Sequence, residues 1–156
     1  MTINALNTAI HNAANNIYKS VLKGECSHKE ISYTNEKLTD GYDEIFSHSG
    51  LYFFVLENGS NKAVAYVGKS ENDQRLRQHL TNKNKDGTDL AKSVSNKYKN
   101  IKNALSNGFT VSVHIYSNPS FEKASLSAIE IKLLEKCQFE LKGVFPNEPK
   151  WISRIG

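Results

Sequence analysis

The sequence predicts an α/β fold of the α+β kind, in which helices flank a small and mostly antiparallel sheet. Two apolar segments, Leu51 to Glu57 and Ala63 to Val67, are separated by Asn58-Gly59-Ser60-Asn61. A turn sequence between two apolar segments is typical of a β-hairpin. Phe109 to Tyr116 alternates apolar and polar side chains, which indicates a strand with one buried face. Apolar residues at helical spacing before and after these segments predict the helices.

An N-terminal helix is predicted over Ile3 to Leu22, where apolar side chains recur at helical spacing. Glu25 to Ser49 is polar, and we expect a loop-rich connector with a short strand at Ile31 to Tyr33. These two parts form an extension over residues 1–48, ahead of a main domain over residues 49–156. A chain of 156 residues is long enough for a single compact domain with a real core.

Three more helices are predicted after the hairpin. Gly68 ends the second hairpin strand, and Gly108 is a natural stop for the middle helix of the three. The polar segment Thr81 to Ser95 reads as a surface loop. The helices are expected at Asn72 to Leu80, around Tyr98 to Leu105 and at Phe121 to Cys137, with an irregular segment from Phe139 to Gly156.

Charge is unevenly distributed, although the whole chain carries only +4 with a pI near 9.0. Nine Lys or Arg residues accompany four acids from Lys69 to Lys102, whereas Met1 to Ser47 has four Lys and six acids. A basic middle segment favours a polyanion such as double-stranded DNA. On charge alone, a solvated surface is the commoner explanation. The residues expected to contact DNA are Arg77, Lys83, Lys85, Lys97 and Lys99.

The cysteine content and the hydropathy pattern favour a cytoplasmic protein. Cys26 and Cys137 show neither metal-ligand spacing nor a disulfide framework, which is usual in a reduced compartment. The N-terminus lacks the basic-then-apolar layout of a signal peptide. No apolar run approaches the roughly 20 residues needed to span a bilayer, so no membrane association is expected.

The most informative stretch runs from Gly50 to Leu80. It contains Gly50-Leu51-Tyr52 at the start of the hairpin and Tyr66-Val67-Gly68-Lys69 at its end. Arg75 and His79 follow four residues apart, which places both on one face of a helix. A cation beside an imidazole, with phenol hydroxyls nearby, suits attack on a phosphodiester.

The order and spacing of these residues resemble the GIY-YIG nuclease family over roughly Ser49 to Trp151. One position departs from the family pattern, because Ile152 follows Trp151 where the family often has an asparagine. The resemblance implies a GIY-YIG-like fold, a DNA endonuclease activity and one Mg²⁺ or Mn²⁺ per active site. It also implies a metal-binding glutamate on a late helix. The implied catalytic residues are Tyr52, Tyr66, Lys69, Arg75, His79 and Glu130.

Two glutamates on the last predicted helix are candidates for the metal ligand. Taking Leu126 as the origin and about 100° per residue, Glu130 falls at about 40°, within the apolar face. Glu135 falls at about 180°, on the opposite side. A carboxylate on an apolar face is costly unless it is paired or bound to a cation. Glu130 is therefore the expected ligand, and a structural salt bridge is the alternative for it.

The resemblance also implies roles for the remaining residues. Tyr52, aided by His79 or Lys69, is expected to help deprotonate the attacking water, while Tyr66 orients the scissile phosphate or assists proton transfer. Arg75 is expected to neutralise charge on the pentacovalent phosphate. Arg77 is two residues from His79, on a different face, so Arg75 is the preferred arginine.

The compact length resembles the stand-alone type II restriction branch of the family. Alternatives are a non-specific degradative or toxin-type nuclease of the same family, or a non-catalytic DNA-binding module. A homodimer or higher homo-oligomer is expected for a restriction enzyme that cuts both strands of a palindrome. The helix at Ile3 to Leu22 has two possible roles: it supplies that interface or packs on its own core.

Overall fold

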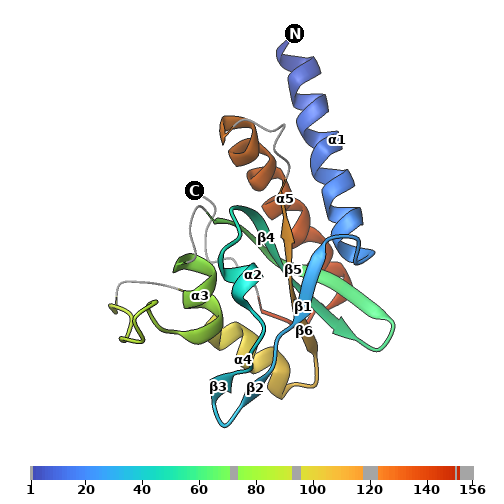
Figure 1. Cartoon of the computed structure of the whole chain (residues 1–156). Coiled ribbons are helices and arrows are strands. Elements are labelled where there is room, and N and C mark those ends of the chain that lie inside the picture. Colours follow the sequence, from blue (N-terminus) through green and yellow to red (C-terminus); the bar gives the residue numbers. More distant parts are fainter. Residues whose placement is uncertain (1, 71–73, 93–95, 118–122, 150, 152–156) are drawn as a thin grey trace.

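A four-stranded antiparallel sheet forms the centre of the molecule, with helices on both of its faces (Figure 1). The computed structural model describes residues 2–70, 74–92, 96–117, 123–149 and 151. Within these residues the predicted α+β class is confirmed. The described helices are α1 (Ile3–Leu22), α2 (Asp43–Phe46), α3 (Gln74–Thr81), α4 (Tyr98–Ser106) and α5 (Lys123–Val144).

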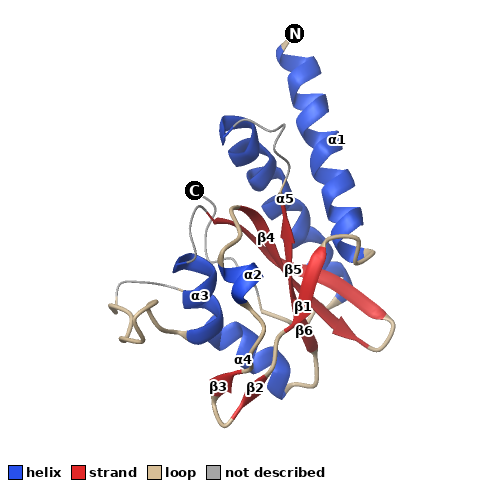
Figure 2. Cartoon of the chain, viewed as in Figure 1, coloured by secondary structure: helices blue, strands red, loops and turns tan. Residues whose placement is uncertain are grey.

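The strand order in the central sheet is β1-β6-β4-β5, and a separate small sheet pairs β2 with β3 (Figure 2). The predicted hairpin is formed by β4 and β5, which pair from Gly50 opposite Ser70 to Asn58 opposite Asn61. Gly59 in the turn has a φ of +63°, which glycine adopts without strain. The strands are β1 (Ser27–Glu30), β2 (Tyr33–Thr34), β3 (Lys37–Leu38), β4 (Gly50–Asn58), β5 (Asn61–Ser70) and β6 (Thr110–Tyr116).

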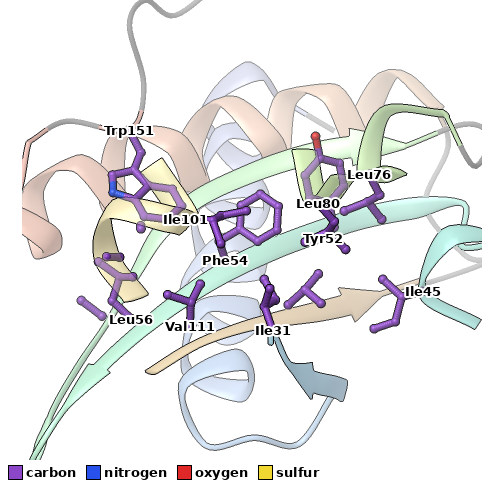
Figure 3. Close-up of a cluster of buried hydrophobic side chains, with 14 of the residues drawn as sticks. Ile31, Ile45, Tyr52, Phe54, Leu56, Leu76, Leu80, Ile101, Val111 and Trp151 are labelled. Carbon is purple, nitrogen blue, oxygen red and sulfur yellow. The ribbon is translucent and has the colours of Figure 1, made fainter. Parts of the chain in front are cut away.

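Two hydrophobic clusters cover the two faces of the sheet, because successive side chains of a strand point to opposite faces. Tyr52, Phe54 and Leu56 of β4 belong to one cluster, together with buried residues of α3 and α4 and with Trp151 (Figure 3). The intervening β4 residues, Leu51, Phe53 and Val55, join buried residues of α1 and α5 in the other. Strand β4 is therefore the centre of both clusters.

A close approach between two strands fixes the position of the Tyr52 side chain. Tyr52 and Gly68 are cross-strand partners in the β4–β5 pair. A Cβ atom on Gly68 would overlap the phenol ring of Tyr52. Strand β5 continues past Gly68 to Ser70, so this glycine lies within the strand and does not end it. The Gly68 position thus provides the space that the Tyr52 ring occupies.

The predicted connector contains a strand of the central sheet. We expected a short strand at Ile31 to Tyr33, but β1 occupies Ser27–Glu30 and pairs with β6. Three of its four side chains are exposed, as is usual for an edge strand, so no apolar alternation marks it in the sequence. The connector also contributes α2, β2 and β3. Residues 1–48 therefore supply one edge of the sheet.

The last helix is longer than predicted. It continues past Cys137 to Val144, so the expectation of an irregular segment from Phe139 onward was wrong over that stretch. The exposed side chain of Phe139 interrupts the apolar pattern, while Leu141 is buried one turn after Cys137. The predicted start of this helix at Phe121 and the first two residues predicted for α3 lie outside the described residues.

Helix α1 matches its predicted bounds. Gly24, just after its C-terminus, has a φ of +72°, which is typical of a helix stop. None of the helices in the described part of the chain has the length and apolar content needed to cross a membrane.

Candidate active site

Three residues from different elements form a continuous hydrogen-bonded row. Tyr52 on β4 and His79 on α3 lie with the phenol oxygen 2.9 Å from Nε2 of the imidazole. The backbone N–H of Lys97, just before α4, donates to Nδ1 of His79 over 3.0 Å. Tyr52 and His79 are both fully buried. The sheet and two helices thus hold this row in place.

The Lys97 contact determines the protonation state of His79. A ring nitrogen that accepts a backbone N–H carries no proton, so the proton of the neutral imidazole lies on Nε2. Burial lowers the pKa of His79 well below its usual value, and the nearby charges of Arg75 and Lys97 lower it further. His79 is therefore neutral at physiological pH and donates its Nε2–H to the oxygen of Tyr52.

Tyr66 on β5 extends the row. Tyr52 and Tyr66 interact electrostatically, and their ring centroids lie 6.3 Å apart. Because the Tyr52 oxygen accepts from His79, its own proton is free to be donated to Tyr66. The hydrogen bonds then run in one direction, from Lys97 through His79 to Tyr52, whose hydroxyl acts electrostatically on Tyr66. Successive donors of this kind favour negative charge on the last oxygen.

The two tyrosines differ in exposure and acidity. Tyr52 is 1% exposed, whereas Tyr66 is only partly buried. Burial raises the pKa of Tyr52 well above its usual value, and Tyr66 raises it further. Burial also raises the pKa of Tyr66 above its usual value; Arg75 opposes this rise, Glu130 adds to it, and the Tyr52 hydroxyl lowers it. Tyr66 is therefore the more easily ionised phenol and the one that a ligand can reach.

Two cations lie beside Tyr66. The ammonium of Lys97 is 5.0 Å from the centroid of its ring, and Arg75 acts electrostatically on both Tyr66 and Lys97. Burial and the Arg75 charge lower the pKa of the half-buried Lys97. The Arg75 guanidinium donates from Nη1 to Oε1 of the buried Gln78 over 3.3 Å. Gln78 thus helps to hold Arg75 near the tyrosines.

Helix α5 brings Glu130 to the same region. Burial raises the pKa of Glu130, and the charge of Lys69 opposes this rise. Lys69 Nζ, at the end of β5, donates to Oγ of Ser127 over 2.9 Å. Ser127 precedes Glu130 by three residues and lies on the same face of α5. Glu130 also acts electrostatically on Tyr52 and Tyr66, so all six predicted catalytic residues lie around one place.

The two candidate glutamates differ in their surroundings. Glu130 is half-buried beside the tyrosines, whereas Glu135 is exposed. Glu135 lies 3.7 Å from Lys132 in an ion pair one turn along the helix, an ordinary surface arrangement. Of the two, only Glu130 is near the tyrosines.

The side chains near the tyrosines can be compared with the ligands that a divalent cation requires. Within the described residues, no group of three or more His, Cys, Asp or Glu side chains is arranged to hold a metal. Mg²⁺ keeps several of its waters and is commonly bound by one or two carboxylates together with substrate phosphates. A single half-buried carboxylate, partly balanced by Lys69, fits that mode of binding.

The predicted DNA-contacting residues fall into two groups. Lys83, Lys85 and Lys99 are exposed on or after the segment that joins α3 to α4. Lys83 is paired with Asp89 in the same segment. Arg77 instead places its guanidinium 4.2 Å from the ring centroid of Phe46 on α2, and Lys97 faces Tyr66. Arg77 and Lys97 therefore also take part in packing within the molecule.

Sequence reasoning missed three contributions to this site. Gln78 and Ser127 position Arg75 and Lys69, and the backbone of Lys97 positions His79. The predicted helical face carrying Arg75 could have drawn attention to Gln78, three residues further on. No spacing in the sequence signals the Lys97 contact, because it joins two elements through a backbone group.

Comparisons of the chain with protein-family models, with curated proteins and with solved structures found no match. The resemblance to the GIY-YIG family therefore stays a prediction that rests on the motif residues themselves.

Proposed function

We propose that the chain is a metal-dependent endonuclease that hydrolyses phosphodiester bonds of double-stranded DNA. The proposal is carried by the hydrogen-bonded row from Lys97 through His79 to Tyr52, together with the electrostatic contacts of Tyr66 with Tyr52, Arg75 and Glu130. A phenol that is supported by donors and flanked by cations can ionise and accept a proton from water. A nearby half-buried carboxylate supplies the negative charge that a divalent cation needs.

The arrangement favours Tyr66, and not Tyr52, as the group that accepts the proton of the attacking water. Tyr52 has almost no exposure, and the imidazole behind it already donates its Nε2 proton. Tyr52 and His79 act through Tyr66, by directing donors towards its oxygen. This division of roles differs from the one expected from sequence, in which Tyr52 was the base.

The cations around Tyr66 would neutralise the charge of a bound phosphate. Arg75 neutralises charge that develops on the phosphoryl oxygens, and Gln78 restricts its motion. Lys97, over the ring of Tyr66, and Lys69, which acts on Glu130, add further positive charge. Bound Mg²⁺ or Mn²⁺ would polarise the phosphate and stabilise the leaving oxygen. Glu130, with water molecules and a phosphate oxygen, would hold that cation.

Among the roles of such an enzyme, we favour that of a type II restriction enzyme. The exposed lysines at positions 83, 85 and 99 provide sequence-independent attraction to the phosphate backbone. Cleavage of both strands of a palindrome would require two copies of the site, related by symmetry.

A digestion experiment tests the proposal directly. Plasmid DNA and a phage genome are incubated with the protein, with Mg²⁺ or with a chelator. Metal-dependent cleavage is expected, and discrete bands would identify a sequence-specific enzyme, whereas a smear would identify a degradative one. DNA binding without cleavage under any metal condition would instead favour a non-catalytic binding module.

A further inference from the structure

Helix α1 is buried over one half only. Ala14, Ile17, Tyr18 and Val21 in its C-terminal half pack into the cluster shared with α5. Its N-terminal half extends beyond the rest of the molecule (Figure 1) and is exposed from Ile3 to Ala9. The two roles expected for this helix therefore apply to different halves: one packs on the core, and the other has no partner among the described residues.

The exposed half carries an apolar stripe. Ile3, Leu6, Ile10, Ala13 and Ile17 follow one another at alternating steps of three and four residues. This spacing is the seam of paired helices. Ile3 and Leu6 are 79% and 46% exposed, and they are two of the few large hydrophobic side chains exposed in the described part. The stripe thus continues the buried face of α1 out into solvent.

The composition of α1 restricts what can cover this stripe. No Asp, Glu, Lys or Arg occurs from Ile3 to Tyr18. This composition is typical of an interface, which is depleted in charged residues, and not of an ordinary surface helix, which is rich in them. A helical stretch without Lys or Arg is unsuited to DNA and lacks the basic face of a membrane-surface helix. Two copies of an uncharged face, in contrast, can meet without like-charge repulsion.

A groove beside the C-terminal half of α1 can accept the exposed N-terminal half of the same helix from a second copy. Ala13, Asn16, Ile17 and Ser20 line it together with Tyr116 of β6, with a volume of about 250 Å³. The groove lies at the inner end of the stripe, and Ile3 and Leu6 lie at the outer end. If two helices run antiparallel about an axis at Ile10, Ile3 and Leu6 of each copy meet the groove of the other. Such a contact is self-complementary, as two-fold symmetry requires.

We propose that α1 pairs with α1 of a second copy of this chain, antiparallel and centred on Ile10, to form a symmetric dimer. The pairing also accounts for the ordering of a weak helix. Five asparagines occur in α1, and asparagine is a poor helix former. About ten unsupported residues form a helix only marginally in water, so packing against a partner stabilises the exposed half. The inference uses no property of the proposed active site.

Oligomeric state gives the first test. Sedimentation equilibrium of the full chain without DNA, at about 1 to 100 µM, covers the range of moderate and weak dimers. Wild type should be a dimer in this range. The variant Ile3→Lys/Leu6→Lys should be monomeric, with an unchanged melting temperature at low concentration because both positions are exposed. The control Ala5→Lys/Asn12→Lys adds the same charge to the opposite, exposed face and should remain a dimer.

Disulfide trapping tests the register. In a Cys26→Ser background, Ile10→Cys should form a covalent dimer on mild oxidation, because the two copies meet at the axis. Ile3→Cys should not crosslink to itself in an antiparallel pair, but would do so in a parallel one. A monomeric wild type, or equal dissociation of the Lys variant and its control, would overturn the proposal. Cleavage assays on the monomeric variant are scored separately, so that a failure of the proposed nuclease function leaves this result intact.

Discussion

The phenol ring of Tyr52 occupies the space over Gly68, its partner on the adjacent strand, where any Cβ atom would overlap it. The short sequence Tyr66-Val67-Gly68 therefore has two structural consequences. It places the Tyr66 hydroxyl beside that of Tyr52, and it leaves room for the Tyr52 ring to reach His79. The backbone of one strand thus determines where the hydrogen-bonded row of the other can lie.

The first prediction is that Gly68→Ala destabilises the protein by about 1–3 kcal/mol, the usual range for overpacking a core. The added methyl group would force Tyr52 out of its position and break its hydrogen bond to His79. Gly143→Ala is a suitable control, because a Cβ there meets open space at the end of α5. That change should raise stability by roughly 0.5–1 kcal/mol. Urea unfolding of both variants measures the difference; equal effects would contradict the close approach.

The second prediction concerns the tyrosines. Tyr66→Phe should lower the single-turnover cleavage rate by at least about two decades and remove its rise with pH. Its stability should change by only about 1 kcal/mol. Tyr52→Phe leaves the Nε2–H of His79 buried without an acceptor, so it should cost about 1–3 kcal/mol in stability as well as activity. A Tyr66→Phe enzyme with a near-native rate would exclude Tyr66 as the base.

The third prediction separates the two glutamates of α5. Glu130→Gln should abolish cleavage and leave DNA binding nearly unchanged, since the amide keeps the shape of the carboxylate but not its charge. Glu135→Gln, on the exposed side of the helix, should cleave normally. Calorimetric titration with Mn²⁺ in the presence of DNA provides a readout besides activity. The reverse pattern in a plasmid assay would show that Glu135 is the ligand.

The fourth prediction uses two lysines that are close in sequence. Lys97→Met keeps the backbone N–H that positions His79 but removes the ammonium beside Tyr66. Turnover should fall by one to two decades, on the order expected when one electrostatic contact is lost. Lys99→Met removes an exposed charge and should only weaken DNA binding and its salt dependence. Similar turnover for the two variants would place Lys97 among the general DNA contacts.

The fifth prediction is that acid destabilises the fold through His114. Burial, the charge of His28 (stacked on it at 4.5 Å) and the charge of Lys62 together lower its pKa to about 4. A histidine has a pKa of about 6.5 when unfolded, so below that pH the unfolded chain binds more protons than the folded one. The contribution of neutral His114 to the free energy of unfolding is complete above about pH 6.5 and is lost as the pH falls towards 4. At pH 5 the loss is at most about 2 kcal/mol.

Denaturant unfolding at pH 7.5 and pH 5 measures this loss. His114→Phe retains a ring on β6 but cannot titrate, so it should lose less stability on acidification than wild type does. His11→Asn, at an exposed position of α1, should lose as much as wild type. The pKa of His79 is also lowered, so some loss of stability in acid should persist in the His114 variant.

Elements with a clear apolar period could be predicted from the sequence. Helix α1 and the β4–β5 hairpin bury regular sets of side chains, and the periodicity of those sets is visible in the chain. Strand β1 could not be predicted in this way, because it pairs through its backbone and exposes most of its side chains. The exposed Phe139 similarly obscured the continuation of α5 past Cys137.

The candidate site likewise has features that could be predicted from the sequence and features that could not. The resemblance to the GIY-YIG family implied Tyr52, Tyr66, Arg75, His79 and Glu130, and these residues interact with one another in the structure. The direction of the hydrogen bonds between them could not be inferred, since it depends on the backbone N–H of Lys97. Spacing along the chain identifies side chains that share one helix or strand. It contains no information on backbone groups of other elements that contact those side chains.

The pairing of β1 with β6 has a consequence for the order of folding. Ser27 pairs with Ile115 across about 90 residues of intervening chain, whereas β4 and β5 meet through a tight turn. Contacts between neighbours in sequence form quickly, and closing a long loop is slow. During synthesis, the residues of β1 leave the ribosome long before Thr110 to Tyr116 exist. The edge of the sheet is therefore completed late, after the hairpin that carries both tyrosines has formed.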